Sequence, residues 1–167
     1  MLNPAWYAVH VRSRHEFQIN ERFRLKGIES FLPTVDRQSM WKDRKKIVTF
    51  PLFPGYLFVN TTKDSQNLLS VLKVKGVVRL ISTLPGEPDP IPDEQITNLK
   101  LLVDNKEALD PYPYLTEGQR VRIIRGPMLG LEGILIEKLD KHMLILSVDV
   151  LQQGVALTIT AGDVERV

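Results

Sequence analysis

Apolar and polar residues alternate in short runs through the first half of the chain. Trp6–Val11 is aromatic and β-branched with partial alternation, and this pattern predicts a strand. Further strands are predicted at Glu29–Val35, Lys46–Phe50 and Val77–Ile81, and Tyr56–Asn60 is predicted as a short buried strand. The polar stretch Asp36–Lys45 separates the second strand from the third, as in a hairpin.

Helical segments are expected between these strands. His15–Lys26 lacks proline and glycine and is rich in Glu, Gln and Arg, so it favours a helix that Gly27 ends. Ser65–Val74 is a second candidate, closed by Gly76. Asp93 stands where an N-cap belongs, because Ile96, Leu99 and Leu102 follow it at helical spacing. Helices that flank a sheet indicate an α+β fold.

The last third of the chain has a different pattern. Glycines separate short runs of Ile, Leu and Val, which predicts a small β-barrel. The expected strands are Arg120–Ile123, Ile134–Ile136, Met143–Val150 and Val155–Ile159. Before them, Asp110-Pro111-Tyr112-Pro113 shows no periodicity, and two prolines in such a stretch predict a semi-rigid linker. A domain boundary is therefore expected there.

Composition narrows the classes of protein. Residues 1–60 carry ten Lys/Arg and five Asp/Glu, whereas residues 104–167 carry seven and ten, so the front is basic and the back is acidic. This asymmetry suggests two domains with different partners. The chain has no cysteine and three scattered histidines, so no metal site is expected. Neither a signal peptide nor a membrane span is apparent, and a cytoplasmic protein is expected.

Several segments, taken in order, resemble the NusG family of bacterial transcription factors. Trp6-Tyr7-Ala8-Val9 opens the first strand, and Phe53-Pro54-Gly55-Tyr56-Leu57-Phe58-Val59 is the most specific match. The others are Lys75-Gly76-Val77-Val78 with Ile91-Pro92-Asp93-Glu94 downstream, and Glu117–Ile123 leading into Gly126-Pro127-Met128-Leu129-Gly130-Leu131-Glu132-Gly133, which looks like a KOW motif.

The resemblance implies two domains. Residues 1–104 would form an NGN domain, a mostly antiparallel sheet flanked by helices that binds RNA polymerase. Residues 105–115 would be the linker, and residues 116–167 a KOW domain, a small SH3-like β-barrel of five strands. Val11–Glu16, Asp43–Lys46 and Leu151–Gln153 are more similar to specialised paralogues of the UpxY and RfaH type, which act on particular operons.

An aromatic set follows from the resemblance, in which this part of the domain receives the clamp helices of RNA polymerase. The aromatic set is Tyr7, His10, Phe53, Pro54, Tyr56 and Phe58. Leu57 and Val59 are expected to be core. A strand alternates its side chains between two faces, so only part of the aromatic set is expected to face outward.

A basic set is the candidate surface for upstream or non-template DNA, since Lys and Arg contact phosphates without regard to sequence. The basic set is Arg12, Arg14, Arg22, Arg24, Trp41, Lys42, Arg44, Lys45 and Lys46. In RfaH-like relatives the first helix reads an exposed DNA strand, and Arg12 and Arg22 match those positions. Trp41 could stack on a base or cap the hairpin. A merely solvated basic face is the alternative.

Two further groups of residues are carried over from the family. Asn67 and Ser70 match a segment that touches the opposite jaw of the polymerase, whereas the neighbouring leucines are expected to be helix core. A turn set, Val150, Leu151, Gln152 and Gln153, matches the loop with which housekeeping NusG binds Rho or a ribosomal protein. That loop carries a Phe and a basic residue, where this chain has Leu151 and Gln153, and the departure argues against Rho.

The sequence therefore predicts a transcription elongation or antitermination factor, directed at particular operons. It is not expected to be an enzyme, and no cofactor or small-molecule substrate is expected, because no catalytic grouping of residues stands out. The alternatives are a housekeeping NusG that assists Rho and an RNA-binding, ribosome-associated KOW protein. The acidic back of the chain argues against the latter.

Overall fold

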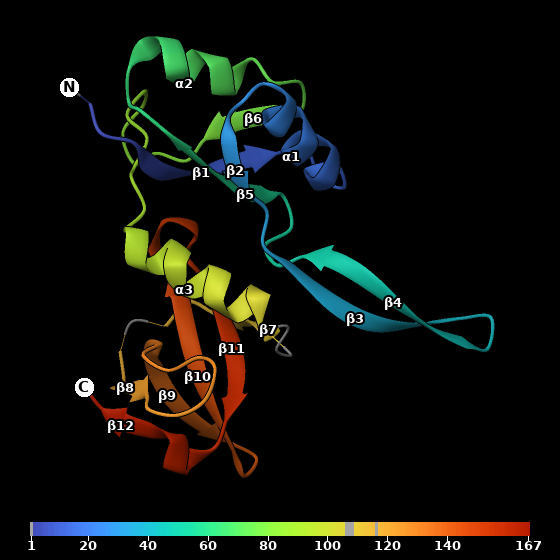
Figure 1. The fold of residues 1–167 in the computed structure, drawn as a ribbon, viewed down its shortest axis with the longest axis vertical. Coiled ribbons are helices and arrows are strands. Elements are labelled where there is room, and N and C mark those ends of the chain that lie inside the picture. The colour runs from blue at the N-terminus through green and yellow to red at the C-terminus, as the bar shows by residue number, and fades with distance from the viewer. Residues whose placement is uncertain (1, 106–108, 116) are drawn as a thin grey trace. The chain divides into compact units, whose positions relative to one another are not determined.

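The computed structural model describes residues 2–105, 109–115 and 117–167. The chain divides into two compact units, Met1–Thr97 (unit 1) and Asn98–Val167 (unit 2). Figure 1 shows the helices and strands of both units, whose fold class is α+β as predicted.

Unit 1 is built on a four-stranded antiparallel sheet in the order β2-β5-β1-β6. Its strands are β1 (Ala5–Val11), β2 (Glu29–Phe31), β5 (Tyr56–Thr61) and β6 (Val77–Leu80). One face of the sheet packs against α1 (Glu16–Leu25) and α2 (Ser65–Leu72), where Phe23 and Val71 join Val9 and Leu57 in one buried cluster. The predicted helices His15–Lys26 and Ser65–Val74 and the predicted strands at β1, β5 and β6 are confirmed, and Gly27 follows α1 at a φ of 73°.

A long hairpin leaves this sheet between β2 and β5. It consists of β3 (Thr34–Trp41) and β4 (Arg44–Pro51), which pair only with each other among the described residues. Lys42 and Asp43 form its two-residue turn with φ values of 43° and 65°, the left-handed pair that a tight hairpin of type I′ requires. The expected single strand Glu29–Val35 is wrong, because the chain is interrupted at Leu32-Pro33 and enters a separate ribbon.

Unit 2 contains a six-stranded antiparallel sheet in the order β12-β8-β9-β10-β11-β7. The strands are β7 (Leu109–Pro113), β8 (Gln119–Ile123), β9 (Glu132–Lys138), β10 (Lys141–Val148), β11 (Gln153–Ile159) and β12 (Val164–Arg166). Short 3-10 helices, η1 (Asp149–Leu151) and η2 (Ala161–Asp163), connect the last strands. Gly133 lies so close to β10 that a Cβ there would approach the Ile145 carbonyl oxygen to 2.6 Å.

The connection before the barrel differs from the expected linker 105–115. Leu109–Pro113 forms strand β7, which pairs with β11. Proline is compatible with an edge strand, because the outward side of such a strand needs no N–H donor. Residues 106–108 lie outside the described residues. Helix α3 (Asp93–Asp104) includes Asp93 itself, and it crosses the division between the units, which falls before the expected boundary at 104. Ile96, Leu99 and Leu102 are buried as their spacing predicts.

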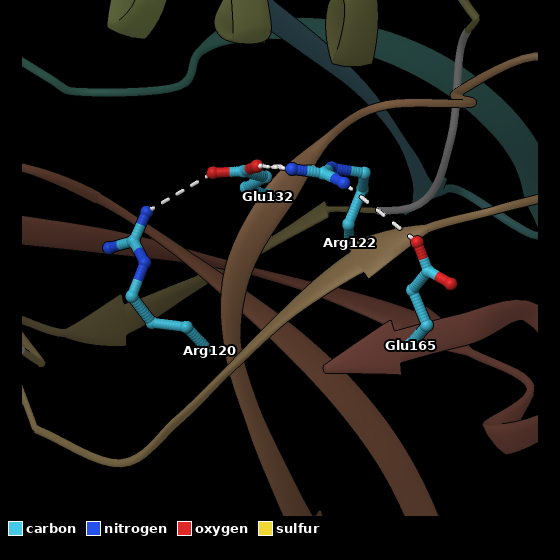
Figure 2. Close-up of polar contacts among 4 residues, drawn as sticks. All are labelled: Arg120, Arg122, Glu132 and Glu165. Carbon is cyan, nitrogen blue, oxygen red and sulfur yellow. Dashed lines mark hydrogen bonds and ion pairs between the residues drawn. The ribbon is translucent and has the colours of Figure 1, made fainter. Parts of the chain in front are cut away.

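Ion pairs join three strands of unit 2 on one surface. Glu132 of β9 accepts hydrogen bonds from Arg122 of β8, at 2.7 Å from Nη2, and lies 3.5 Å from the guanidinium of Arg120. Arg122 also reaches Glu165 of β12 at 3.8 Å (Figure 2). The hydrogen bond from Arg122, assisted by Arg120, holds the pKa of the Glu132 carboxyl below its ordinary value of 4.5.

We expect unit 2 to lose stability in acid, because protonation of the Glu132 carboxylate removes its ion pairs. A folded pKa below the unfolded one contributes stability that is present above the unfolded pKa and is lost as pH falls through the folded pKa. Glu132→Gln should therefore reduce the loss of stability between neutral pH and about pH 3 by up to roughly 1 kcal/mol, as for other partly exposed ion pairs. Urea titrations at both pH values measure this. Glu165→Gln removes a longer contact and should therefore change the acid-induced loss of stability less. An equal loss of unfolding free energy between the two pH values in Glu132→Gln and in the unmodified chain would refute the prediction.

Candidate functional site

The aromatic set is divided between the two faces of the sheet of unit 1. Tyr7 lies on the same face as Val9 and Leu57, packed under the helices, and only 2% of it is exposed. Burial also raises the pKa of the Tyr7 hydroxyl. The nomination of Tyr7 as a contact residue is therefore wrong on geometric grounds, because the period of two places it opposite to His10.

The other members of the aromatic set cluster on the opposite face. His10 pairs with Tyr56 across β1 and β5, and their rings stack with centroids 5.2 Å apart. Phe58 pairs with Ala8 and meets Phe53 edge-on, with centroids 6.2 Å apart. This face of the sheet is thus lined by aromatic rings.

The turn between the hairpin and β5 shapes one end of this aromatic face. The Tyr56 amide donates to the carbonyl oxygen of Phe53 at 3.0 Å, which closes a four-residue turn. Pro54 and Gly55 occupy its centre, and Gly55 has a φ of 85°. This is the pattern of a type II turn, in which proline fixes the first central residue and glycine the second.

Accessibility separates the aromatic set further. Phe53 and Phe58, which were expected to contact the polymerase, are as buried as Tyr7, with 2% and 0% of their surface exposed, so they form core and not accessible surface. His10 and Tyr56 are half-buried, and Pro54 is exposed. The accessible part of the aromatic set is therefore the His10–Tyr56 stack with Pro54 beside it, which we call the stack patch. Phe31, which was not nominated, is half-buried and stacks on Phe58 at 6.1 Å, and only the β2–β5 register brings it there.

The hairpin presents most of the basic set at its tip. Lys42, Arg44, Lys45 and Lys46 are all exposed. Trp41 is 66% exposed and pairs with Arg44, and Ser39 pairs with Lys46. Residues paired directly across two strands share a face, so Trp41, Arg44 and Lys46 lie on one face of the ribbon. That face offers an aromatic surface and cations together, and Trp41 is too exposed to serve as a packed cap.

The arginines of α1 and its preceding loop are less uniform. Arg12 and Arg14 are exposed. Arg22 donates from Nη1 to the carbonyl oxygen of Lys75 at 2.7 Å, so part of its hydrogen-bonding capacity is used within the fold. Arg24 pairs with Glu21, and the hydrogen bond from Arg24 lowers the pKa of Glu21. Arg24 is thus the member of the basic set whose charge is best compensated.

A basic hollow lies beside Arg22. It measures about 340 Å³ and is lined by Arg22, Leu25 and Lys26 of the first helical segment and by Lys73, Val74 and Lys75 after α2. The three lysines were not nominated from the sequence, because the two segments are far apart in the chain and meet only in the fold. They extend the positive surface from α1 toward β6.

The α2 residues serve mainly local structure. The Asn67 side chain donates to Asp64, the N-cap of α2, at 2.8 Å, and to Thr62. The Ser70 hydroxyl donates to the Gln66 carbonyl oxygen at 3.0 Å within the helix. The expectation that the leucines are core is wrong in part, because Leu69 is 49% exposed whereas Leu68 packs against the core.

The turn set forms one continuous turn between β10 and β11. Val150 and Leu151 belong to η1 and are partly exposed. Gln152 adopts a left-handed conformation with a φ of 53°, and its side-chain amide donates to the Asp149 carbonyl oxygen at 2.7 Å. Gln153 begins β11. The turn is thus ordered by its own hydrogen bonds.

Within residues 2–105, 109–115 and 117–167, no group of three or more His, Asp or Glu side chains is placed to hold a metal ion. In the same part of the chain no helix is both long and apolar enough to cross a membrane.

A family model described as "Transcription termination factor nusG" matches residues 4–100. Among individual proteins, the chain is 25% identical to the transcription termination/antitermination protein NusG of Borreliella burgdorferi, with 99% of this chain and all of that protein aligned. It is also 25% identical to the protein of the same name from Pseudomonas aeruginosa, where the alignment covers 97% of this chain and 98% of the relative.

A solved structure that concerns domain interaction in Thermotoga maritima NusG resembles the whole chain. The TM-score is 0.61 at 20% identity, and the alignment covers 99% of this chain and 98% of that one. This likeness supports the fold.

Proposed function

The chain belongs to the NusG family, and from that membership we propose that it binds RNA polymerase through unit 1 and suppresses pausing or termination. Such a factor catalyses no reaction. It would act by binding one conformational state of the polymerase more tightly than another, which shifts the population toward that state. In this proposal unit 1 is the NGN domain and unit 2 is the KOW domain.

The observation that carries this proposal is the aromatic face of unit 1. The stack patch leaves aromatic surface accessible, while Phe58 is buried on the same face of the sheet with Phe53 packed against it. Partly exposed aromatic side chains held rigidly in place are typical of interface hot spots, because they bury area at little cost in conformational entropy. We propose that the clamp helices of RNA polymerase contact this patch. Asn67 and Ser70 are proposed as a secondary contact, and Asn67 would also keep its capping role.

The basic set is proposed to contact the upstream or non-template DNA beside the polymerase. The hairpin tip supports this best, since exposed Trp41 shares a face with Arg44 and Lys46. An aromatic ring can stack on an unpaired base while the cations contact phosphates. Arg12, Arg14, Arg22 and the lysines of the basic hollow are a second proposed contact. Arg24 contributes least, because Glu21 compensates its charge.

The KOW domain is proposed to recruit a second partner through the turn set, and a ribosomal protein is the candidate. Rho is disfavoured, because Leu151 and Gln153 stand where the family's loop has a Phe and a basic residue. For the same reason we propose a specialised, operon-directed factor ahead of a housekeeping NusG. A pull-down that captures Rho with the full chain would favour the housekeeping function.

An elongation assay tests the proposed function. RNA polymerase halted at a defined pause should escape about two to five times faster when the chain is present, if binding favours the elongating state by roughly 0.5–1 kcal/mol. The matched control is Tyr56→Ala, which alters the stack patch and should lose most of the effect. Unchanged pause lifetimes at saturating concentrations of the unmodified chain would contradict the proposal.

A further inference from the structure

Strand β7 covers the outer edge of β11 in unit 2. The two strands pair in antiparallel register from Leu109 opposite Leu157 to Pro113 opposite Gln153. Without β7, β11 would present a row of unpaired backbone N–H and C=O groups. An edge of that kind accepts a strand from another chain.

The composition of β7 makes it a weak partner for β11. Only every second residue of an edge strand turns its N–H toward the neighbouring strand, and Pro111 and Pro113 share one phase, so at most two N–H groups of β7 can donate to β11. Leu109 is buried, whereas Asp110 and Pro113 are exposed. The strand thus begins with a buried leucine and ends with an exposed proline.

Polar contacts hold the chain just after β7. The Tyr114 hydroxyl donates to Oδ1 of Asp149 at 2.7 Å, and the Ser147 hydroxyl donates to the Leu115 carbonyl oxygen at 2.8 Å. Asp149 is the first residue of η1, which leads into the turn set. These contacts place the end of β7 directly beside the proposed partner-binding turn, so a partner on that turn would meet β7.

Gly154 allows β7 to approach closely. A Cβ at this position would lie 3.0 Å from the carbonyl oxygens of Tyr112 and Pro113, and 3.4 Å from a methyl group of Ile145. The φ of Gly154 is not in the left-handed region, so alanine fits its backbone conformation. A single methyl group there would press on β7 while leaving the strand's own conformation unstrained.

We propose that β7 is a detachable edge strand, which shields β11 until a partner protein supplies an extended strand in its place. The partner half of this inference rests on the proposed recruiting role of the KOW domain, whereas the detachment of β7 is a property of this chain alone. Strand exchange at this edge would make recruitment conditional, because the partner has to displace β7 before it can pair.

The first experiment is hydrogen exchange on the full chain. The natural sequence has no cysteine, so Asp110→Cys with Ala156→Cys gives a single disulfide that locks β7 onto β11. Neighbouring amides of β11 point alternately to β7 and to β10. The β7-facing amides should exchange at least tenfold faster than the β10-facing ones, and oxidation of the double variant should slow the first group alone. One common rate for both groups in the unmodified chain would overturn the proposal.

Gly154→Ala should loosen the contact of β7 with β11, whereas the disulfide locks it. Gly162→Ala is the matched control, since a Cβ at Gly162 would meet nothing within 4 Å. Gly154→Ala should speed exchange of the β7-facing amides at least threefold while the β10-facing amides keep their rate. Gly162→Ala should change neither group. Faster exchange in both groups of Gly154→Ala would indicate general destabilisation of the barrel and count against a separately detaching strand.

Binding to purified small ribosomal subunits tests the partner half. The reduced double variant should bind at least tenfold more tightly than the oxidised form, and Gly154→Ala more tightly than Gly162→Ala. Equal affinity of the oxidised and reduced forms would overturn the gating role of β7. If no form binds, the proposed ribosomal partner is refuted, and the hydrogen exchange result still decides whether β7 detaches.

Discussion

Phe53→Ala is expected to lower the free energy of unfolding of unit 1 by about 3–5 kcal/mol, the usual cost of removing a buried phenylalanine ring. Only 2% of Phe53 is exposed, and its ring meets Phe58 edge-on. Tyr56→Ala should cost less stability, because Tyr56 is half-buried. Phe53→Ala and Tyr56→Ala thus distinguish a core residue from a proposed contact residue within one sequence motif.

Urea denaturation followed by tryptophan fluorescence measures this difference. Both tryptophans lie in unit 1, and Trp6 is buried whereas Trp41 is exposed. A Trp41→Phe background therefore leaves Trp6 as the reporter of the sheet. A Phe53→Ala chain as stable as its parent would show that the ring does not contribute to the core as described.

Neutralising the hairpin tip is expected to remove most of the salt dependence of DNA binding. If the basic set neutralises about three phosphates, log K should fall with log salt at a slope near −2 to −3. Affinity for a single-stranded or forked DNA would then drop roughly 16- to 64-fold between about 50 and 200 mM salt. Changing Lys42, Arg44, Lys45 and Lys46 together to Gln should flatten the slope to a value between about −1 and zero.

The control for the hairpin variant removes the same amount of charge elsewhere. Lys63, Arg125, Lys138 and Lys141 are exposed and lie outside the basic set. Changing these four residues to Gln should leave the slope near that of the unmodified chain, because they are not proposed to meet phosphates. Equal slopes for the hairpin variant and this control would mean that the charged side chains of the hairpin are only hydrated and do not contact DNA.

Local patterns predicted most elements of the fold. Partial period-two alternation located β1, a short apolar run located β5, and the absence of helix breakers followed by Gly27 located α1. Strand β7 was missed, because its prolines resemble a linker until the edge of β11 is known to be beside it. The same limit applies to the hairpin, where Lys46–Phe50 of β4 was predicted but the polarity of Asp36–Lys45 hid most of β3.

The candidate site was predicted less completely than the fold. The motif Phe53–Val59 pointed to the right region, but the face of each residue depends on register. Tyr7 fell on the helix side of the sheet, and Phe31 reached the aromatic face from another strand. Lys73 and Lys75 joined Arg22 only through the contact of two distant segments. Such contacts between segments are not encoded in any local pattern.

The binding of the full chain to core RNA polymerase tests the polymerase contact itself. A fluorescent label at Leu139→Cys suits the titration, because Leu139 is 86% exposed in unit 2 and the chain has no other cysteine. In this background Tyr56→Ala should weaken binding by roughly 2 kcal/mol, which is about 30-fold, as expected for a hot-spot residue. Leu129→Ala, which removes an exposed leucine of unit 2, should bind like the parent. Equal affinities for Tyr56→Ala and its parent, with the fold of both intact, would contradict the proposed interface.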